Sequence, residues 1–216
     1  QLPAANALRL SREYTLHEQQ LAVFFEPPAP FNPLCQYFLT FYPDNSFLPP
    51  GIWTIRIEPV RIRTGIFECW FSDQNALQPG TRFYNATPET TVTIPGTARS
   101  VLTVGAWDSA RQSLADFSGI GPTTDGRIKP DVMAYGSPTS VITGRGSIIN
   151  DNGTSFSSPL IAGMVACLWQ ALPRKTAKQI IKLVKLASNN QQHPDNVFGY
   201  GVPDFWKAYQ TGKAIK

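Results

Sequence analysis

The stretch INDNGTSFSSPLIAGMVACLWQ, residues 149–170, joins a polar turn to an apolar helix. Asn152 and Gly153 are typical of a tight turn whose backbone approaches a neighbour closely. From Ile161 onward, apolar residues recur at spacings of three and four, which predicts a helix. Because Pro159 is tolerated only in a first helical turn, the helix is expected to begin near residues 156–158.

Ser155 is therefore expected at the positive end of this helix, among backbone N–H groups that have no acceptor within the helix. Such an environment stabilises the negative charge that develops during acyl transfer, so Ser155 is a candidate nucleophile. The alternative is that Ser155 only caps the helix, a role that serine commonly takes. This stretch by itself leaves both interpretations open.

The composition is that of a globular chain, with 42% hydrophobic and 16% charged residues among 216. That length suits one large or two small domains. No apolar run is long enough to span a membrane. The net charge of +4 is dispersed, and no nucleic-acid motif accompanies it, so a nucleic acid is not an expected partner. The mild basic clusters are Arg56, Arg61 and Arg63, and a helical set expected to form a solvated face, Lys175, Lys178, Lys182 and Lys185.

The three cysteines do not have the spacing of a metal site. Cys167 falls within the apolar helix and is expected to be a buried thiol. Cys35 and Cys69 could form a disulfide in a secreted chain, but nothing in the sequence requires it. No metal ligands can be assigned.

The two halves of the chain differ in their sequence patterns and in the secondary structure that these predict. Residues 1–78 carry short aromatic and β-branched runs, which predict a small antiparallel sandwich or jelly roll. These runs are QQLAVFFEP (19–27), LCQYFLTFYP (34–43), GIWTIRIEPVRI (51–62) and TGIFECWFS (64–72). Residues 79–216 contain SVLTVGAW (100–107), typical of a strand buried in a parallel sheet, and an amphipathic pattern near 176–187. The expected fold class is α/β.

Several motifs resemble one family. The segment NGTSFSSPLIAG (152–163) resembles the serine motif of subtilisin-like serine proteases, the subtilases of peptidase family S8. The segments TVTIPGTARSVLTVGAWD (91–108), FSGIGPTTDGRIKPDVMAYG (117–136) and GYGVPDFWKAY (199–209) resemble other parts of that family in the same order. The pattern PPGIWTIRI, TGIFECWFS and PGTRF is similar to the β-sandwich inserted into Csp-type clostridial subtilases. The resemblance implies the C-terminal part of a subtilisin-like parallel-sheet domain at 79–216, preceded by an incomplete jelly-roll-like insert at 1–78.

The same resemblance implies roles for individual residues. Ser155 would be the nucleophile, and its own N–H would form part of the oxyanion hole. Thr154 would help to orient the oxyanion, while Asn152 and Gly153 would shape the turn.

Phe117, Ser118 and Gly119 match the family's segment on the leaving-group side of the substrate cleft. Gly163 matches a small position that allows close packing of the helix. The resemblance implies no cofactor. Subtilases often bind calcium, but no calcium site can be assigned in this sequence.

The sequence departs from the family's pattern at the other catalytic residues. Subtilases use an Asp, His and Ser in that chain order. The only histidines are His17 and His193, and neither lies in a His-Gly-Thr context. The early Asp motif and the Ala-Gly-Asn turn of the oxyanion hole are also missing. Asp108-Ser109 looks similar to that Asp motif, but it ends the strand LTVGAW, where the family carries a structural residue.

The sequence therefore predicts a serine endopeptidase whose Asp and His come from an N-terminal part of the same protease, on one precursor or as a separate chain after cleavage. The substrate would be a peptide or protein, and the 216 residues alone would be inactive. One alternative is a pseudoprotease scaffold. Another is a β-sandwich binding module with Trp53 and Trp70 as sugar platforms, although such aromatic residues are more often core.

Two aspartates flank the segment GRIKP. Asp125 and Asp131 could hold a cation, but a turn-forming aspartate and a buried hydrogen-bonded aspartate are favoured, with Arg127 and Lys129 as their partners. Members of the resembled family are secreted or spore-associated, so a bacterial protein outside the cytoplasm is expected.

Overall fold

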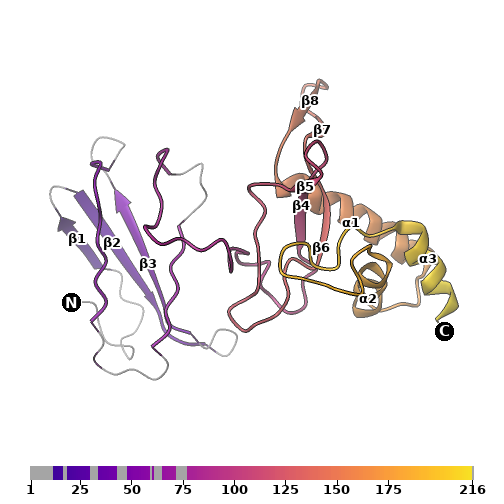
Figure 1. Ribbon diagram of the computed structural model, residues 1–216, viewed down its shortest axis with the longest axis horizontal. Helices are drawn as coiled ribbons and strands as arrows, with labels where there is room; N and C mark the ends of the chain where they lie inside the picture. Colours follow the sequence, from indigo (N-terminus) through magenta and orange to yellow (C-terminus); the bar gives the residue numbers. More distant parts are fainter. Residues whose placement is uncertain are drawn as a thin grey trace. The chain divides into compact units, whose positions relative to one another are not determined.

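The computed structural model describes residues 12–16, 19–29, 34–42, 48–58, 60, 65–71 and 77–215. The chain divides into two compact units, Gln1–Phe67 and Glu68–Lys216. Each unit is described here by itself (Figure 1). A boundary between domains after residue 78, as the sequence suggests, stays a prediction.

The first unit contains a three-stranded antiparallel sheet in the order β1-β2-β3. Its strands are β1 (Arg12–Leu16), β2 (Gln19–Glu26) and β3 (Gln36–Tyr42). Alternate residues of β2 are buried on one face, namely Leu21, Val23 and Phe25. The Phe25 ring lies 4.8 Å from that of Tyr37 on the neighbouring strand. On the other face Ala22 is also buried and Phe24 is 40% exposed, so alternation describes only one face of β2.

Two other expected strands are not observed. The described residues within GIWTIRIEPVRI and TGIFECWFS, namely 51–58, 60 and 65–71, form no strand. Alternation gives a strand only where a neighbouring strand can complete the ladder of hydrogen bonds. Trp53 and Trp70 are 43% and 50% exposed, so the expectation that they are core residues is not confirmed.

The second unit contains one small mixed sheet in the order β5-β4-β6 and a separate hairpin of β7 and β8. The strands are β4 (Val104–Asp108), β5 (Ser113–Leu114), β6 (Val132–Ser137), β7 (Thr139–Ile142) and β8 (Ile148–Asp151). Strands β4 and β6 are parallel, with Val104 opposite Val132, while β5 is antiparallel to β4. Val132, Met133 and Ala134 of β6 are buried. The expected pairing of buried parallel strands is therefore present as a single pair.

Three helices complete this unit: α1 (Thr154–Ala171), α2 (Ala177–Ala187) and α3 (Phe205–Ala214). Helix α1 packs on β4 and β6, and α2 and α3 pack on each other and on α1 (Figure 1). The core joins Ile161 and Leu168 of α1 to Ile180 and Val184 of α2. A capping box at Thr176 starts α2, which confirms the predicted helix near 176–187. Helix α1 begins slightly earlier than the sequence suggests.

Asp131 forms a buried charge network. Its carboxylate accepts from Lys129 Nζ at 2.6 Å and from the Thr103 N–H at 2.8 Å. Lys185 Nζ of α2 lies 2.5 Å from the other carboxylate oxygen. The expected buried, hydrogen-bonded aspartate is confirmed. The expectation of a solvated lysine face is wrong for Lys185, because this side chain reaches back to the sheet.

Asp125 occupies a surface turn. Arg127 Nε donates to its carboxylate at 2.8 Å, and Arg99 lies 2.7 Å away on its other side. The Thr123 hydroxyl donates at 2.6 Å. The turn-forming role predicted for Asp125 is confirmed, with Arg127 as its partner.

Cys167 is exposed, so its assignment as a buried thiol is wrong. Helix α1 is apolar on nearly every side, and its periodicity does not identify the side that faces the core. Only Ser157, Ile161 and Leu168 of this helix are fully buried. In the described part of the chain, no helix combines the length and apolar character of a membrane span.

Candidate active site

The turn before α1 is anchored to strand β6. The Gly153 N–H donates to the Gly136 carbonyl at 2.9 Å, and the Ser157 hydroxyl donates to the Tyr135 carbonyl at 3.2 Å. A Cβ atom on Gly136 would overlap the Ser157 hydroxyl and lie 2.8 Å from the Ala106 Cβ. Only glycine at position 136 therefore lets the helix approach this closely. The contacts fix the position from which α1 starts.

Ser155 is the second residue of α1, and its side chain is exposed. Within the described residues, no hydrogen bond engages its hydroxyl or its backbone N–H. The position that caps the helix belongs to Gly153, so the interpretation of Ser155 as a cap is wrong. A free hydroxyl beside a free N–H at the positive end of a helix is what a nucleophile and half an oxyanion hole require.

The other motif residues, Thr154 and Asn152, lie on either side of Gly153. Thr154 is half-buried at the first position of α1, and Asn152 is exposed immediately before Gly153. The Asn152 N–H donates to the Asp151 carboxylate at 2.8 Å. The four motif residues thus run from the turn, at Asn152 and Gly153, into the first two positions of α1, at Thr154 and Ser155.

No general base accompanies Ser155 among the described residues. No hydrogen bond or ion pair joins Ser155 to a histidine or a carboxylate in the described ranges. His193 is exposed in the loop after α2, where it lines a pocket with Lys207. His17 lies outside the described residues. Without a base, the serine hydroxyl is a weak nucleophile.

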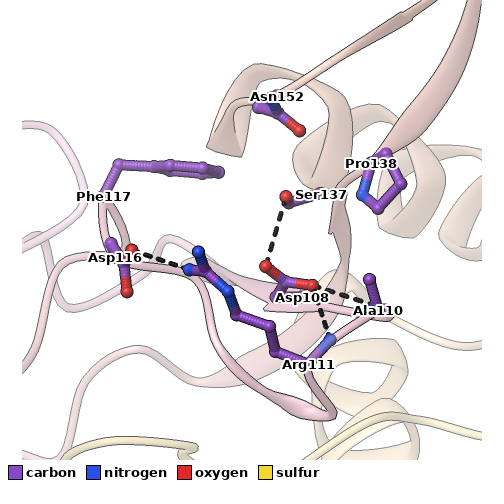
Figure 2. A pocket seen from close by; sticks show the side chains of 8 residues that line it. All are labelled: Asp108, Ala110, Arg111, Asp116, Phe117, Ser137, Pro138 and Asn152. Carbon is purple, nitrogen blue, oxygen red and sulfur yellow. Dashed lines mark hydrogen bonds and ion pairs between the residues drawn. The ribbon is translucent and has the colours of Figure 1, made fainter.

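Figure 2 shows a pocket beside this turn, with a volume of about 330 Å³. Asn152 of the motif and Phe117 from the predicted cleft segment both line it. The remaining lining residues include Asp108, Arg111, Asp116 and Ser137. Segments that are far apart in the sequence therefore converge on one hollow next to the Ser155 turn.

Only one of the three predicted cleft residues faces this pocket. Ser118 is buried, and its hydroxyl accepts from the Ala106 N–H at 3.0 Å. A Cβ atom on Gly119 would lie 3.1 Å from the Thr91 carbonyl oxygen. In this structure Ser118 and Gly119 shape the backbone, and Phe117 lines the pocket.

Asp108 holds the turn that follows β4. Its carboxylate accepts from the Arg111 N–H at 3.0 Å and the Ala110 N–H at 2.9 Å, and the Ser137 hydroxyl lies 3.5 Å away (Figure 2). These interactions, the bond from Arg111 first, lower the pKa of Asp108. Asp108 is therefore an ionised structural carboxylate. Its position at the end of β4 agrees with the structural residue that the family resemblance implies.

An ion pair borders the same pocket. Arg111 NH1 lies 2.9 Å from the Asp116 carboxylate, and both side chains are largely exposed. Sequence reasoning missed this pair as part of the pocket. The signal available was a run of polar residues at the carboxyl end of a buried parallel strand, where α/β proteins place their binding sites.

The described residues contain no group of three His, Cys, Asp or Glu side chains that could hold a metal ion. The possibility of calcium binding, raised by the family resemblance, is not tested by this geometry.

Residues 74–201 match the Subtilase family of peptidases S8. Serine protease AprX of Bacillus subtilis is 32% identical over 140 residues, which cover 55% of this chain and 32% of AprX. Membrane-bound transcription factor site-1 protease of Homo sapiens is 31% identical over 136 residues, covering 58% of this chain and 13% of that protein. The chain thus spans a third or less of the length of these curated relatives.

The structure of the Clostridium perfringens CspB protease is similar in fold, with a TM-score of 0.67 and 19% identity. The likeness covers 97% of this chain and 47% of that one. These matches confirm the resemblance that the four motifs predict: the chain belongs to the subtilase family of serine proteases.

Proposed function

We propose that this chain provides the nucleophile of a serine endopeptidase, which hydrolyses peptide bonds through an acyl-enzyme on Ser155. The observation that carries the proposal is the Ser155 turn itself: an exposed hydroxyl and a free N–H at the start of α1, held by Gly136 and Ser157. The N–H would stabilise the oxyanion of the tetrahedral intermediate. Phe117 and Asn152 would line the leaving-group side of the cleft, with Thr154 and Gly153 orienting the oxyanion and the turn.

The triad needs a histidine to accept the Ser155 proton and an aspartate to orient that histidine. We propose that an N-terminal part of the same protease supplies both, together with the second oxyanion donor. The chain's membership of a triad family and the absence of a base at Ser155 among the described residues support this division.

The surface of α1 gives independent support. Leu160 and Trp169 of α1 are 49% and 43% exposed, and Cys167 is exposed as well. A Cβ atom on Gly163 would meet nothing within 4 Å. An apolar helix with an open glycine on its uncovered side is suited to close packing against a further segment. We propose that the N-terminal part covers this side of α1.

The first unit has the expected kind of sheet for a jelly-roll-like insert, in β1, β2 and β3. The insert itself stays a proposal, as does a location outside the bacterial cytoplasm. A relative such as AprX of Bacillus subtilis is consistent with a bacterial protein.

The test is peptide hydrolysis by a protein that joins the 216 residues to the upstream part of the parent gene. Ser155→Ala should lower kcat by about 10⁴-fold or more, as removal of a triad nucleophile does. Ser158→Ala is the matched control, because Ser158 is exposed in the same turn of α1 and should leave kcat within about twofold.

Two outcomes would contradict the proposal. Activity that survives Ser155→Ala would place the nucleophile elsewhere. An upstream part with neither an Asp nor a His-Gly-Thr motif, and no turnover in the joined protein, would identify a pseudoprotease.

A further inference from the structure

The pocket beside the Ser155 turn, drawn in Figure 2, carries more acidic than basic groups. The carboxylates of Asp108 and Asp116 line it, against one guanidinium, that of Arg111, which leaves one net negative charge. Arg111 and Asp116 form an ion pair with each other at 2.9 Å. Among the described residues, no cation lies within ion-pair distance of the Asp108 carboxylate. The unmatched charge of the pocket is therefore at Asp108.

Asp108 is only 7% exposed, and its two carboxylate oxygens are hydrogen-bonded to different degrees. Oδ1 accepts from the N–H groups of Ala110 and Arg111, at 2.9 and 3.0 Å. Within the described residues, Oδ2 has a single donor, the Ser137 hydroxyl, and their separation of 3.5 Å is at the outer limit of a hydrogen bond (Figure 2). A buried, ionised oxygen without a close donor can accept a further hydrogen bond at low cost.

The other walls of the pocket are suited to a long side chain. The Phe117 ring, which is 43% exposed, and the exposed ring of Pro138 both line the pocket. Lysine and arginine place their methylene groups along such apolar surface while the charged end reaches polar groups, and an aromatic face attracts the cation. The volume of about 330 Å³ is at the lower end of the range for small-ligand pockets, about 300–1,000 Å³, and leaves room for one such side chain.

We propose that this pocket selects a lysine or arginine side chain of the substrate, on the leaving-group side of the scissile bond. The inference rests on the proposed function, in which Phe117 and Asn152 line that side of the cleft. The bound cation would pair with Asp108 and Asp116, which are thus specificity-determining residues.

An acidic substrate side chain is the alternative occupant, because Arg111 could bind it. Arg111 would then have to release Asp116, and the bound carboxylate would lie in the same pocket as the ionised Asp108. Like charges at such short range repel each other, so the cation is the favoured occupant.

The first test is peptide hydrolysis by the protein that joins the 216 residues to the upstream part of the parent gene. Three peptides differ only in the first residue after the scissile bond, which is Lys, Gln or Glu, and a second set varies the next residue. In one of the sets, kcat/KM should fall in the order Lys, Gln, Glu, with about tenfold between Lys and Glu, as expected for partly exposed ion pairs. The preference should shrink in about 1 M sodium chloride, which screens such charges.

Two variants should move this preference in opposite directions. Asp116→Asn removes a carboxylate and frees the Arg111 guanidinium, so the ratio of kcat/KM for Lys over Glu should fall to about one. Arg111→Gln removes the guanidinium but keeps the backbone N–H that donates to Asp108, so the ratio should rise about threefold. Asp125→Asn is the matched control and should leave the ratio unchanged, because Asp125 also pairs with an arginine but does not line the pocket.

A binding measurement separates this inference from the proposed function. The purified 216-residue chain is titrated with tripeptides that begin with Lys, Gln or Glu, and the amide NMR shifts of Ala110, Arg111, Phe117 and Asn152 are followed. Tighter binding of the Lys tripeptide, with no hydrolysis by the joined protein, would support the charge selection and contradict the proteolytic function. Hydrolysis and binding that are equal for Lys and Glu would overturn the charge selection and leave the proteolytic function intact. A preference for Glu would also overturn it, and would identify Arg111 as the selecting residue.

Discussion

Helices α1 and α2 belong to the same core but differ in how much of their surface is covered. Helix α2 is one-sided, with Ile180, Leu183 and Val184 buried and Lys178 exposed. Helix α1 is apolar all around, yet Leu160 and Trp169 remain about half-exposed. The apolar face of α2 is covered by other elements of the described chain. The apolar surface of α1 is larger than the part that those elements cover.

The difference separates two parts of the active site. The N-terminal turn of α1 is held by Gly136 and Ser157, both within the described chain. The outer side of the same helix has open space at Gly163. The Ser155 turn is thus fixed by contacts within the described chain, while the groups that would activate Ser155 are proposed to come from a further segment.

The largest expected change in stability is at Asp131, whose carboxylate pairs with Lys185 of α2. Asp131→Asn leaves the buried Lys129 and the half-buried Lys185 without their carboxylate, so the free energy of unfolding should fall by about 3–5 kcal/mol. Urea denaturation of the purified chain measures this change. Asp116→Asn, which breaks an exposed ion pair, should cost less than about 1 kcal/mol. Equal effects would show that the Asp131 network is not a buried anchor.

The apolar faces of the two helices should respond differently to truncation. Leu183→Ala in α2 removes a side chain that is 4% exposed, and should lower the free energy of unfolding by about 2–5 kcal/mol. Leu160→Ala in α1 removes one that is 49% exposed, and should lower it by less than about 1 kcal/mol. The urea midpoints of the two variants provide the measurement. A large loss in Leu160→Ala would mean that the outer side of α1 is already covered.

Replacing a glycine of α3 or of α1 by alanine should change the stability by smaller amounts and in opposite directions. A Cβ atom on Gly212 of α3 would lie 2.8 Å from Leu183 Cδ1, so Gly212→Ala should destabilise the chain by about 1–3 kcal/mol. Gly163→Ala of α1 meets open space and should stabilise it by about 0.5–1 kcal/mol through helix propensity. Thermal unfolding distinguishes the two signs. In the protein joined to its upstream part, a Gly163→Ala variant that remains stabilised would contradict close packing there.

The smallest expected effect is at an exposed charge outside both helices. The hydrogen bond from Arg127, then that from Thr123, lowers the pKa of Asp125 from 3.8 to about 2. Because the folded-state pKa is the lower one, the stabilisation is fully present above the unfolded value and is lost as the pH falls toward 2. Partial exposure of Asp125 and screening should keep it below about 1 kcal/mol. In Asp125→Asn, the urea midpoint should depend less on pH between pH 4 and 2.5 than in the unaltered chain. An equal pH dependence in the two proteins would contradict the lowered pKa of Asp125.

Features carried by local sequence were predictable. The capping box at Thr176, strand β2 and the helix after the Gly153 turn each depend on neighbouring residues, and the structure contains all three. The four family motifs identified the subtilase family, which the match over residues 74–201 confirms.

Features that depend on distant partners were not predictable. The exposure of Cys167 depends on which side of an apolar helix is covered, and the helix's own periodicity does not contain that information. The described parts of GIWTIRIEPVRI and TGIFECWFS have the composition of strands but form none. The Arg111–Asp116 pair reaches the pocket of Asn152 through the fold of the sheet, which spacing along the chain does not show.

The central proposal is that Ser155 is the nucleophile and that the described residues provide no base for it, and labelling with a fluorophosphonate probe tests it most directly. The purified 216-residue chain should show no labelling above that of its Ser155→Ala variant, because an unassisted serine hydroxyl reacts poorly. The protein joined to its upstream part should be labelled at Ser155, as mass spectrometry of its peptides would show. Strong labelling of Ser155 in the chain alone would contradict the account, since a general base would then already be present.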